Sequence, residues 1–240
     1  MLPDRHWWME GRARVLEKIM ENHSLRGGVA LDAGAGNGFW GQRISPRFDT
    51  LVLLEPDPQL GMHIKERQPS LNVVSAALPG TLPFDEATFN FIFCLDVIEH
   101  VDDDYKSVRE LRRILGPKGV LLLSAPAHPR LWSQMDLKVG HKRRYTRAGL
   151  ESLLKAAEFE LLLLEPLNVW LYPVAWLMRK MNRTGGSLPP RPLNSALARI
   201  FASEARFVGA WPSYMRGLSW VCLAQSPDRD RAPASQSNPV

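Results

Sequence analysis

The sequence is poor in cysteine, and this shortage removes several classes of protein. Only Cys94 and Cys222 occur among the 240 residues, and both lie inside apolar stretches. Two cysteines cannot form a disulfide framework or a four-cysteine zinc site, so we expect buried thiols and a reducing, cytoplasmic compartment. We assign no metal ligands from the sequence.

A long uninterrupted apolar run is also lacking. The longest apolar stretch covers residues 161–178, and Glu165, Asn168 and Pro173 interrupt it. A membrane-spanning helix needs about 20 largely apolar residues, so we expect none here. The first 20 residues carry scattered charges and lack the apolar core of a signal peptide.

A strong excess of one charge is missing too. The formal net charge is +5, too mild to favour a nucleic-acid partner by itself. The densest basic segment is 141–147, with the sequence HKRRYTR. A solvated loop, a contact for an anionic acceptor and an RNA contact are all open interpretations of this segment.

Short apolar runs alternate with helical patterns from residue 28 to about 165. Runs that are apolar throughout are typical of strands buried on both faces of a parallel sheet. We predict helices at 38–44, 57–66, 103–115 and 147–157. We predict seven strands, at 29–32, 50–55, 71–74, 89–95, 119–124, 159–164 and 218–224. The pattern indicates an α/β protein with a doubly wound, mostly parallel sheet.

The last third of the chain has a different composition. Residues 166–216 are rich in tryptophan and proline and separate the last two predicted strands, with one helix predicted at 194–208. We interpret 1–225 as a single domain and 166–216 as an insertion within it. Residues 226–240 contain one aliphatic side chain and are predicted to be a disordered tail.

A glycine-rich turn, LDAGAGNG at 31–38, follows the first predicted strand. Glycines allow close approach of the backbone to a ligand, and amides at the next helix start can hold a negative group. The dinucleotide fingerprint requires a small residue where Phe39 stands, so NAD and FAD are not favoured. Glu55 ends the second strand 17 residues beyond Gly38, where an acidic side chain can hold two ribose hydroxyls.

These features resemble the class I S-adenosylmethionine-dependent methyltransferases, and most closely the type 11/12 methyltransferase domains. LDAGAGNG, LLEPD, TLPFDEATFNFIFCLDVIEHVDD and ELRRILGPKGVLLLSAPA are similar to that group's motifs along residues 5 to about 165. The resemblance implies a Rossmann-like seven-stranded sheet with the insertion before its last strand. It also implies S-adenosyl-L-methionine as cofactor and S-adenosyl-L-homocysteine as product.

The resemblance also implies a set of cofactor-binding residues. Gly34 and Gly36 would contact the methionine part and Glu55 the ribose. The acidic adenine contact common in relatives is missing here, where Ser75-Ala76-Ala77-Leu78 stands, so backbone amides of Ala77 or Leu78 would replace it. The complete predicted set is Asp32, Gly34, Gly36, Gly38, Glu55, Pro56, Ala77, Leu78, Cys94 and Leu95.

The methyl acceptor is expected to be a small organic molecule that is hydrophobic, lipid-linked or a specialised metabolite. His141 and His100 are the candidate catalytic residues, because loops at the carboxyl ends of strands supply acceptor contacts. The insertion is interpreted as an ordinary packed subdomain, as a lid over a hydrophobic acceptor, or as a contact for a membrane surface. An RNA or protein methyltransferase and a non-catalytic cofactor-binding partner are the alternatives, and the sequence leaves the oligomeric state open.

Overall fold

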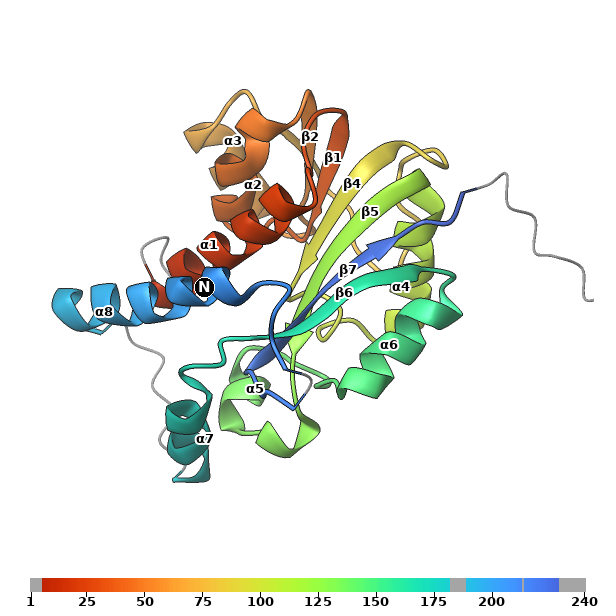
Figure 1. The fold of residues 1–240 in the computed structure, drawn as a ribbon. Helices are drawn as coiled ribbons and strands as arrows, with labels where there is room; N and C mark the ends of the chain where they lie inside the picture. The colour runs from red at the N-terminus through yellow and green to blue at the C-terminus, as the bar shows by residue number, and fades with distance from the viewer. Residues whose placement is uncertain (1–5, 182–188, 213, 229–240) are drawn as a thin grey trace, which may run out of the picture.

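One mixed sheet of seven strands forms the centre of the molecule, in the order β3-β2-β1-β4-β5-β7-β6 (Figure 1). This arrangement comes from a computed structural model that describes residues 6–181, 189–212 and 214–228. The strands are β1 (Val29–Ala33), β2 (Thr50–Leu54), β3 (Asn72–Val74), β4 (Phe89–Leu95), β5 (Leu115–Pro126), β6 (Glu160–Leu167) and β7 (Ser219–Gln225). The first five are parallel, and β7 pairs antiparallel with both β5 and β6.

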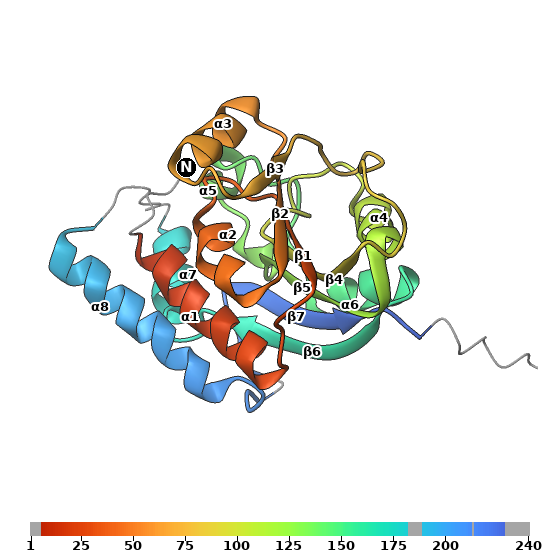
Figure 2. The same cartoon turned by 90° about the horizontal axis from the view of Figure 1, so that it is seen from above.

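Helices cover both faces of the sheet, because the strands bury side chains alternately on each side. In β4, Ile92 and Cys94 pack with α4 (Asp104–Ile114) and α6 (Arg147–Ala156), while Phe93 and Leu95 pack with α1 (Trp7–Asn22) and α2 (Phe39–Ile44). Figure 2 shows these two helical layers on opposite sides of the strands. The helices are α1 (Trp7–Asn22), α2 (Phe39–Ile44), α3 (Pro58–Arg67), α4 (Asp104–Ile114), α5 (Gln134–Lys138), α6 (Arg147–Ala156), α7 (Tyr172–Lys180) and α8 (Arg191–Ala202), with short 3₁₀ helices at Ser45–Arg47, Pro129–Leu131 and Ser203–Phe207.

The insertion between β6 and β7 packs against the amino-terminal helix. Helices α1 and α8 lie side by side, as both views show. Phe201 of α8 is fully buried, with its ring centroid 6.4 Å from Trp7 and 5.3 Å from Trp8. The two tryptophans therefore pack in the hydrophobic core between α1 and the insertion.

Several predicted boundaries differ from the observed ones. Strand β5 starts at Leu115 and runs through Gly116 and Pro117, where its pairing with β4 is irregular, whereas the sequence placed its start at 119. Strand β6 extends to Leu167, so the insertion begins at Asn168. Helix α8 ends at Ala202 and continues as a 3₁₀ helix, instead of reaching 208.

Two further expectations concern membranes and the carboxyl terminus. No helix among the described residues has the length and apolar character to cross a bilayer. Of the tail predicted at 226–240, only 226–228 belong to the described residues, so the prediction for the rest lies outside them.

Helices α5 and α7 were not predicted, because one is very short and the other follows a run interrupted by proline.

Candidate active site

The glycine turn between β1 and α2 lies at the carboxyl edge of the sheet. Gly34, Gly36 and Gly38 have φ angles of +93°, +59° and +79°, a region that L-residues with side chains avoid. A Cβ on Gly34 would come within 2.5 Å of Val97, whereas a Cβ on Gly36 would meet nothing within 4 Å. The backbone at Gly36 therefore faces open space.

Glu55 holds this turn in place from the end of β2. Its carboxylate accepts hydrogen bonds from the amides of Gly36, at 2.7 Å, and Asp57, at 2.9 Å. Burial raises the pKa of Glu55, and these two hydrogen bonds partly offset that rise. Because β1 and β2 are parallel neighbours, their carboxyl ends bring the turn and the carboxylate together.

Two adjoining cavities open on either side of the turn, and Gly34 and Gly36 line both. The larger has a volume of about 390 Å³ and the smaller about 180 Å³. The larger is lined by Gly34, Gly36, Leu54, Glu55, Pro56, Ala76, Ala77, Leu78, Pro79, Asp96, Val97, His100, Val101, Asp102 and Lys142. The smaller is lined by Met9, Arg12, Asp32, Gly34, Ala35, Gly36, Asn37, Trp40 and Leu95.

The smaller cavity contains a carboxylate that is only partly compensated. Asp32 is 2% exposed, and its Oδ2 atom has no hydrogen-bond partner among the described residues. Burial raises the pKa of Asp32 to about 7, and the neighbouring positive charge of Arg12 only partly opposes this rise. Arg12 itself forms an ion pair with Asp96, whose other oxygen accepts a hydrogen bond from Ser124 at 2.9 Å. The cavity thus offers negative charge to a cationic ligand.

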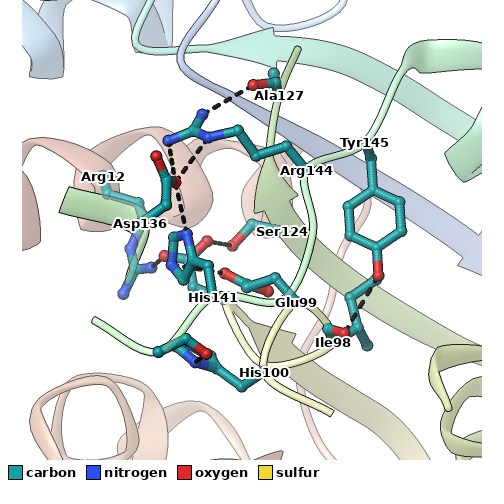
Figure 3. A network of polar contacts seen from close by, with 12 residues as sticks. Arg12, Ile98, Glu99, His100, Ser124, Ala127, Asp136, His141, Arg144 and Tyr145 are labelled. Carbon is teal, nitrogen blue, oxygen red and sulfur yellow. Dashed lines mark hydrogen bonds and ion pairs between the residues drawn. The ribbon is translucent and has the colours of Figure 1, made fainter. Parts of the chain in front are cut away.

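A polar cluster lies beyond the larger cavity, around Asp136 of α5 (Figure 3). Asp136 is 1% exposed and accepts hydrogen bonds from His141 Nδ1 at 2.9 Å and Arg144 Nε at 2.7 Å. Arg179 of α7 adds a contact of 3.0 Å. Burial would raise the pKa of Asp136, but these hydrogen bonds and positive charges hold it well below its usual value.

His141 and His100 face each other in this region. Their ring centroids lie 4.9 Å apart, and His100 Nδ1 lies 3.1 Å from the carbonyl oxygen of Gly140. Burial lowers the pKa of His100. His141 Nε2 lies 3.8 Å from the buried carboxylate of Glu99. Figure 3 shows the His141 ring between Asp136 and Glu99.

Most of the predicted cofactor residues gather at the two cavities. Gly34, Gly36, Glu55, Pro56, Ala77 and Leu78 line the larger one, while Asp32 and Leu95 line the smaller one. Gly38 lines neither, and a Cβ there would meet Ile64 of α3 at 3.0 Å. Cys94 is fully buried in β4, and burial raises the pKa of its thiol.

The two predicted catalytic histidines have different positions. His100 lines the larger cavity, whereas His141 stands behind it on Asp136. Lys142 is the only residue of the basic segment 141–147 among the lining residues, and it pairs with Asp102. Arg143 and Arg144 bind carboxylates and backbone carbonyls of the protein, which accounts for most of the basic charge there.

Sequence reasoning missed Asp136 and Arg179. They are 43 residues apart and belong to two helices that were not predicted. A buried carboxylate in a short helix has no periodicity that marks it. The capping pair formed by Ser133 and Asp136 was the one available signal, because it indicates a helix start at this point.

Comparison with known families gives a match over most of the chain. Residues 5–164 match the sequence model of a family described as "Methyltransferase domain". A relative from Mycolicibacterium smegmatis, named a probable S-adenosylmethionine-dependent methyltransferase, is 26% identical over 237 residues. The aligned segment covers 98% of this chain and 85% of that protein.

Two further comparisons concern function and fold. A rice protein named 2-methyl-6-phytyl-1,4-hydroquinone methyltransferase 2 is 28% identical over 131 residues, which cover 53% of this chain and 37% of that one. The solved structure of an S-adenosylmethionine-dependent methyltransferase from Mesorhizobium loti superimposes with a TM-score of 0.58 at 14% identity. It covers 82% of this chain and 90% of the other, and it supports the fold alone.

Proposed function

Because the chain belongs to the methyltransferase-domain family, we propose that it transfers a methyl group from its cofactor to a small, hydrophobic organic acceptor. The chain is an S-adenosylmethionine-dependent methyltransferase by its relatives, and its cofactor is S-adenosyl-L-methionine, which leaves as S-adenosyl-L-homocysteine. The observation that carries the proposal is the glycine turn, held by Glu55 at the meeting point of two cavities.

The described residues fit this cofactor. The open space at Gly36 leaves room for a ligand against the backbone, and Asp32 has a buried carboxylate oxygen without a partner. A sulfonium cation is the kind of ligand that would compensate such a charge. The methyl group is supplied by that sulfonium when the cofactor is bound.

We assign the individual contacts as the sequence analysis predicted them. Gly34 and Gly36 hold the methionine part, Glu55 the ribose hydroxyls, and Pro56 flanks the adenine. Backbone amides of Ala77 or Leu78 receive the adenine, and the backbone at Cys94–Leu95 receives the cofactor amino group. Support comes from the cavities, since all of these residues except Cys94 line one of them.

A hydrophobic acceptor is supported by apolar side chains around the acceptor side. Val174, Trp176, Leu177 and Met178 of α7 are all at least partly exposed to solvent. Arg179 joins α7 to the segment before His141, through hydrogen bonds to Leu131 and Ser133. No described residue of the insertion lines either cavity, so we propose that its contribution to acceptor binding lies at the entrance. The rice relative is named for activity on a phytyl hydroquinone, and this name also supports a hydrophobic acceptor.

His141 and His100 are assigned to the acceptor, where the proton lost by a hydroxyl must go. Asp136 binds His141 Nδ1 and so fixes the orientation of the ring with Nε2 pointing away from α5. His141→Ala should leave cofactor affinity nearly unchanged and lower turnover by about 10²–10⁴-fold, the usual contribution of a positioned proton acceptor. A change confined to the Michaelis constant of the acceptor would instead indicate a binding role.

The proposal is tested by binding and by a mass-shift screen. Calorimetry should show binding of S-adenosyl-L-methionine and S-adenosyl-L-homocysteine, with no binding of NAD. Isotopically labelled cofactor is then offered with prenylated hydroquinones, long-chain carboxylic acids, polar amines, RNA and unfolded protein. We expect label in the hydroquinones or acids. Label in RNA or protein would overturn the acceptor class, and cofactor binding without transfer to any acceptor would favour the non-catalytic partner.

A further inference from the structure

The cluster formed by Glu99, His100 and His141 is the feature that the proposed cofactor contacts leave unused. One ligand atom from each of the three residues lies within 4.8 Å of the other two. Glu99 and His100 follow β4, and His141 comes from the segment after α5. The structure therefore unites residues that are about 40 positions apart in the chain, which their spacing does not reveal.

Glu99 is buried, and the charges of Arg12 and Arg144 only partly offset the cost of that burial. Its residue is 0% exposed, and neither carboxylate oxygen has a hydrogen-bond partner among the described residues. A buried carboxylate is costly unless it is paired, protonated or bound to a cation.

The nearest positive side chains are already committed to other carboxylates. Arg144 binds Asp136 at 2.6 Å, Lys142 binds Asp102, and Arg12 binds Asp96. None of the three forms an ion pair with Glu99. The carboxyl group of Glu99 is therefore available to an external cation.

Both histidines are oriented as metal ligands usually are. A ligating imidazole typically gives its other ring N–H to a carboxylate or carbonyl, which fixes the tautomer. His141 Nδ1 contacts Asp136 at 2.9 Å, and His100 Nδ1 contacts the carbonyl oxygen of Gly140 at 3.1 Å. If each Nδ1 carries the proton in these contacts, each Nε2 has a free lone pair.

On this geometry we propose that Glu99, His100 and His141 bind one divalent transition-metal ion. Two imidazoles and one carboxylate suit Zn²⁺ and its neighbours, whereas Mg²⁺ and Ca²⁺ prefer oxygen ligands throughout. At bond lengths of about 2.0–2.2 Å, tetrahedral ligand atoms lie roughly 3.4 Å apart. The 3.8 Å between Glu99 Oε1 and His141 Nε2 is close to this value. The three ligand atoms lie within 4.8 Å of one another, so binding an ion requires them to approach by up to about 1.4 Å.

The position of the site gives the ion a function. His100 lines the larger cavity, so an ion held by its ring lies next to the space beside the glycine turn. Three protein ligands leave a coordination position for a hydroxyl group, whose pKa a divalent ion lowers. With the ion bound, the two histidines would act as its ligands instead of as the proton acceptors assigned above, and the acceptor hydroxyl would lose its proton to solvent. This role rests on the proposed function, whereas the binding site itself does not.

The test measures metal binding directly on the full chain without a histidine tag. The protein is stripped with a chelator, equilibrated with Zn²⁺ by dialysis and analysed for metal, and Co²⁺ is added separately to record its visible absorption. We expect one ion per chain, a Co²⁺ spectrum typical of a site with nitrogen ligands, and a thermal midpoint raised by Zn²⁺. Glu99→Gln and His100→Ala should each weaken binding at least tenfold.

Matched variants keep the result interpretable. Glu99→Gln has nearly the same shape and removes a buried charge, so it should fold and should not be less stable than the wild type without metal. His63→Ala removes an exposed histidine of α3 and should bind metal as the wild type does. Equal metal binding by Glu99→Gln and the wild type, or no binding by the wild type, would overturn the proposal. Cofactor calorimetry on the same samples separates that failure from a failure of the proposed function.

Discussion

The two sides of the site are built in different ways. The donor side, residues 32–38 and 54–56, consists of short segments at the ends of two neighbouring parallel strands. The acceptor side, as we assign it, consists of Glu99, His100, Asp136, His141 and Arg144, and it depends on contacts between segments about 40 residues apart. The geometry of the donor side depends mainly on backbone conformation, and the geometry of the acceptor side depends mainly on buried charges.

This difference has consequences for stability. On the donor side, the Asp32 carboxylate is buried with one oxygen unpaired, and burial raises its pKa. On the acceptor side, Asp136 is equally buried but has two cationic partners, Arg144 and Arg179, and a hydrogen bond from His141, and its pKa is lowered. We therefore expect the loss of Asp136 to affect folding, and substitutions in the glycine turn and at Glu55 to affect ligand binding.

The largest effect is expected from Asp136→Ala. Removing this carboxylate leaves Arg144, which is 8% exposed, without its partner inside the protein. We expect the free energy of unfolding to fall by about 3–5 kcal/mol, as when one member of a buried ion pair is lost. Urea denaturation measures the change. Asp102→Ala, which breaks an exposed pair with Lys142, is the control and should leave the unfolding midpoint unchanged. Equal midpoints for the two variants would contradict the comparison.

The next effect is expected from Gly36→Val. A valine here directs its side chain into the cavity, so cofactor affinity measured by calorimetry should fall by about 100-fold or more, equivalent to roughly 2.7 kcal/mol. The backbone strain at φ +59° needs its own control. Gly209→Val offers one, because Gly209 has φ +83°, no atom near its Cβ and no place in either cavity. Weak cofactor binding by Gly209→Val as well would show that strain alone is responsible.

A smaller effect is expected from Glu55→Ala. The variant loses the carboxylate that we assign to the ribose, together with its hydrogen bonds to Gly36 and Asp57. Cofactor binding should weaken by about 1–3 kcal/mol, the range for hydrogen bonds to a charged group. Glu55→Gln keeps one acceptor oxygen and should lose less. Calorimetry at one pH ranks the three proteins, and identical affinities would remove Glu55 from the ribose site.

The smallest effect is expected in the pH dependence of stability between pH 6 and 8. Asp32 has a pKa of about 7 in the folded chain and about 3.9 when unfolded. Its stabilising contribution is therefore complete below pH 4 and declines as the pH rises to 7. Between pH 6 and 8 the remaining loss is about 1.4 kcal/mol. Asp32→Asn should remove this part of the slope in denaturation curves taken at both pH values.

Asp136 has the opposite sign, which sharpens the comparison. Its pKa is lowered on folding, so its contribution is present above about pH 4 and is lost as the pH falls below that value. Asp32→Asn should therefore leave the acid limb of the stability profile as it is. If Asp32→Asn flattened the acid limb instead, the buried carboxylate that controls stability in acid would be Asp32 and not Asp136.

The sequence by itself determined the donor side. The run 31–38 and Glu55 each lie within a few residues of a strand end, and parallel strands place such ends at one edge whatever the rest of the chain does. Glycine spacing and apolar runs are properties of short sequence segments, so they can be identified from neighbouring residues alone. The seven strands of a mostly parallel sheet, the family and the cofactor were predicted from the same kind of local pattern.

Only the tertiary structure decided the acceptor side. Nothing in the letters around Asp136 shows that Arg144 and Arg179 will meet there, because long-range ion pairs leave no periodic trace. The sequence offered His100 and His141 as separate candidates, and the fold placed their rings 4.9 Å apart beside a buried Glu99. The physical reason is that the cost of burying a charge depends on every group around it, and those groups are assembled only when the chain folds.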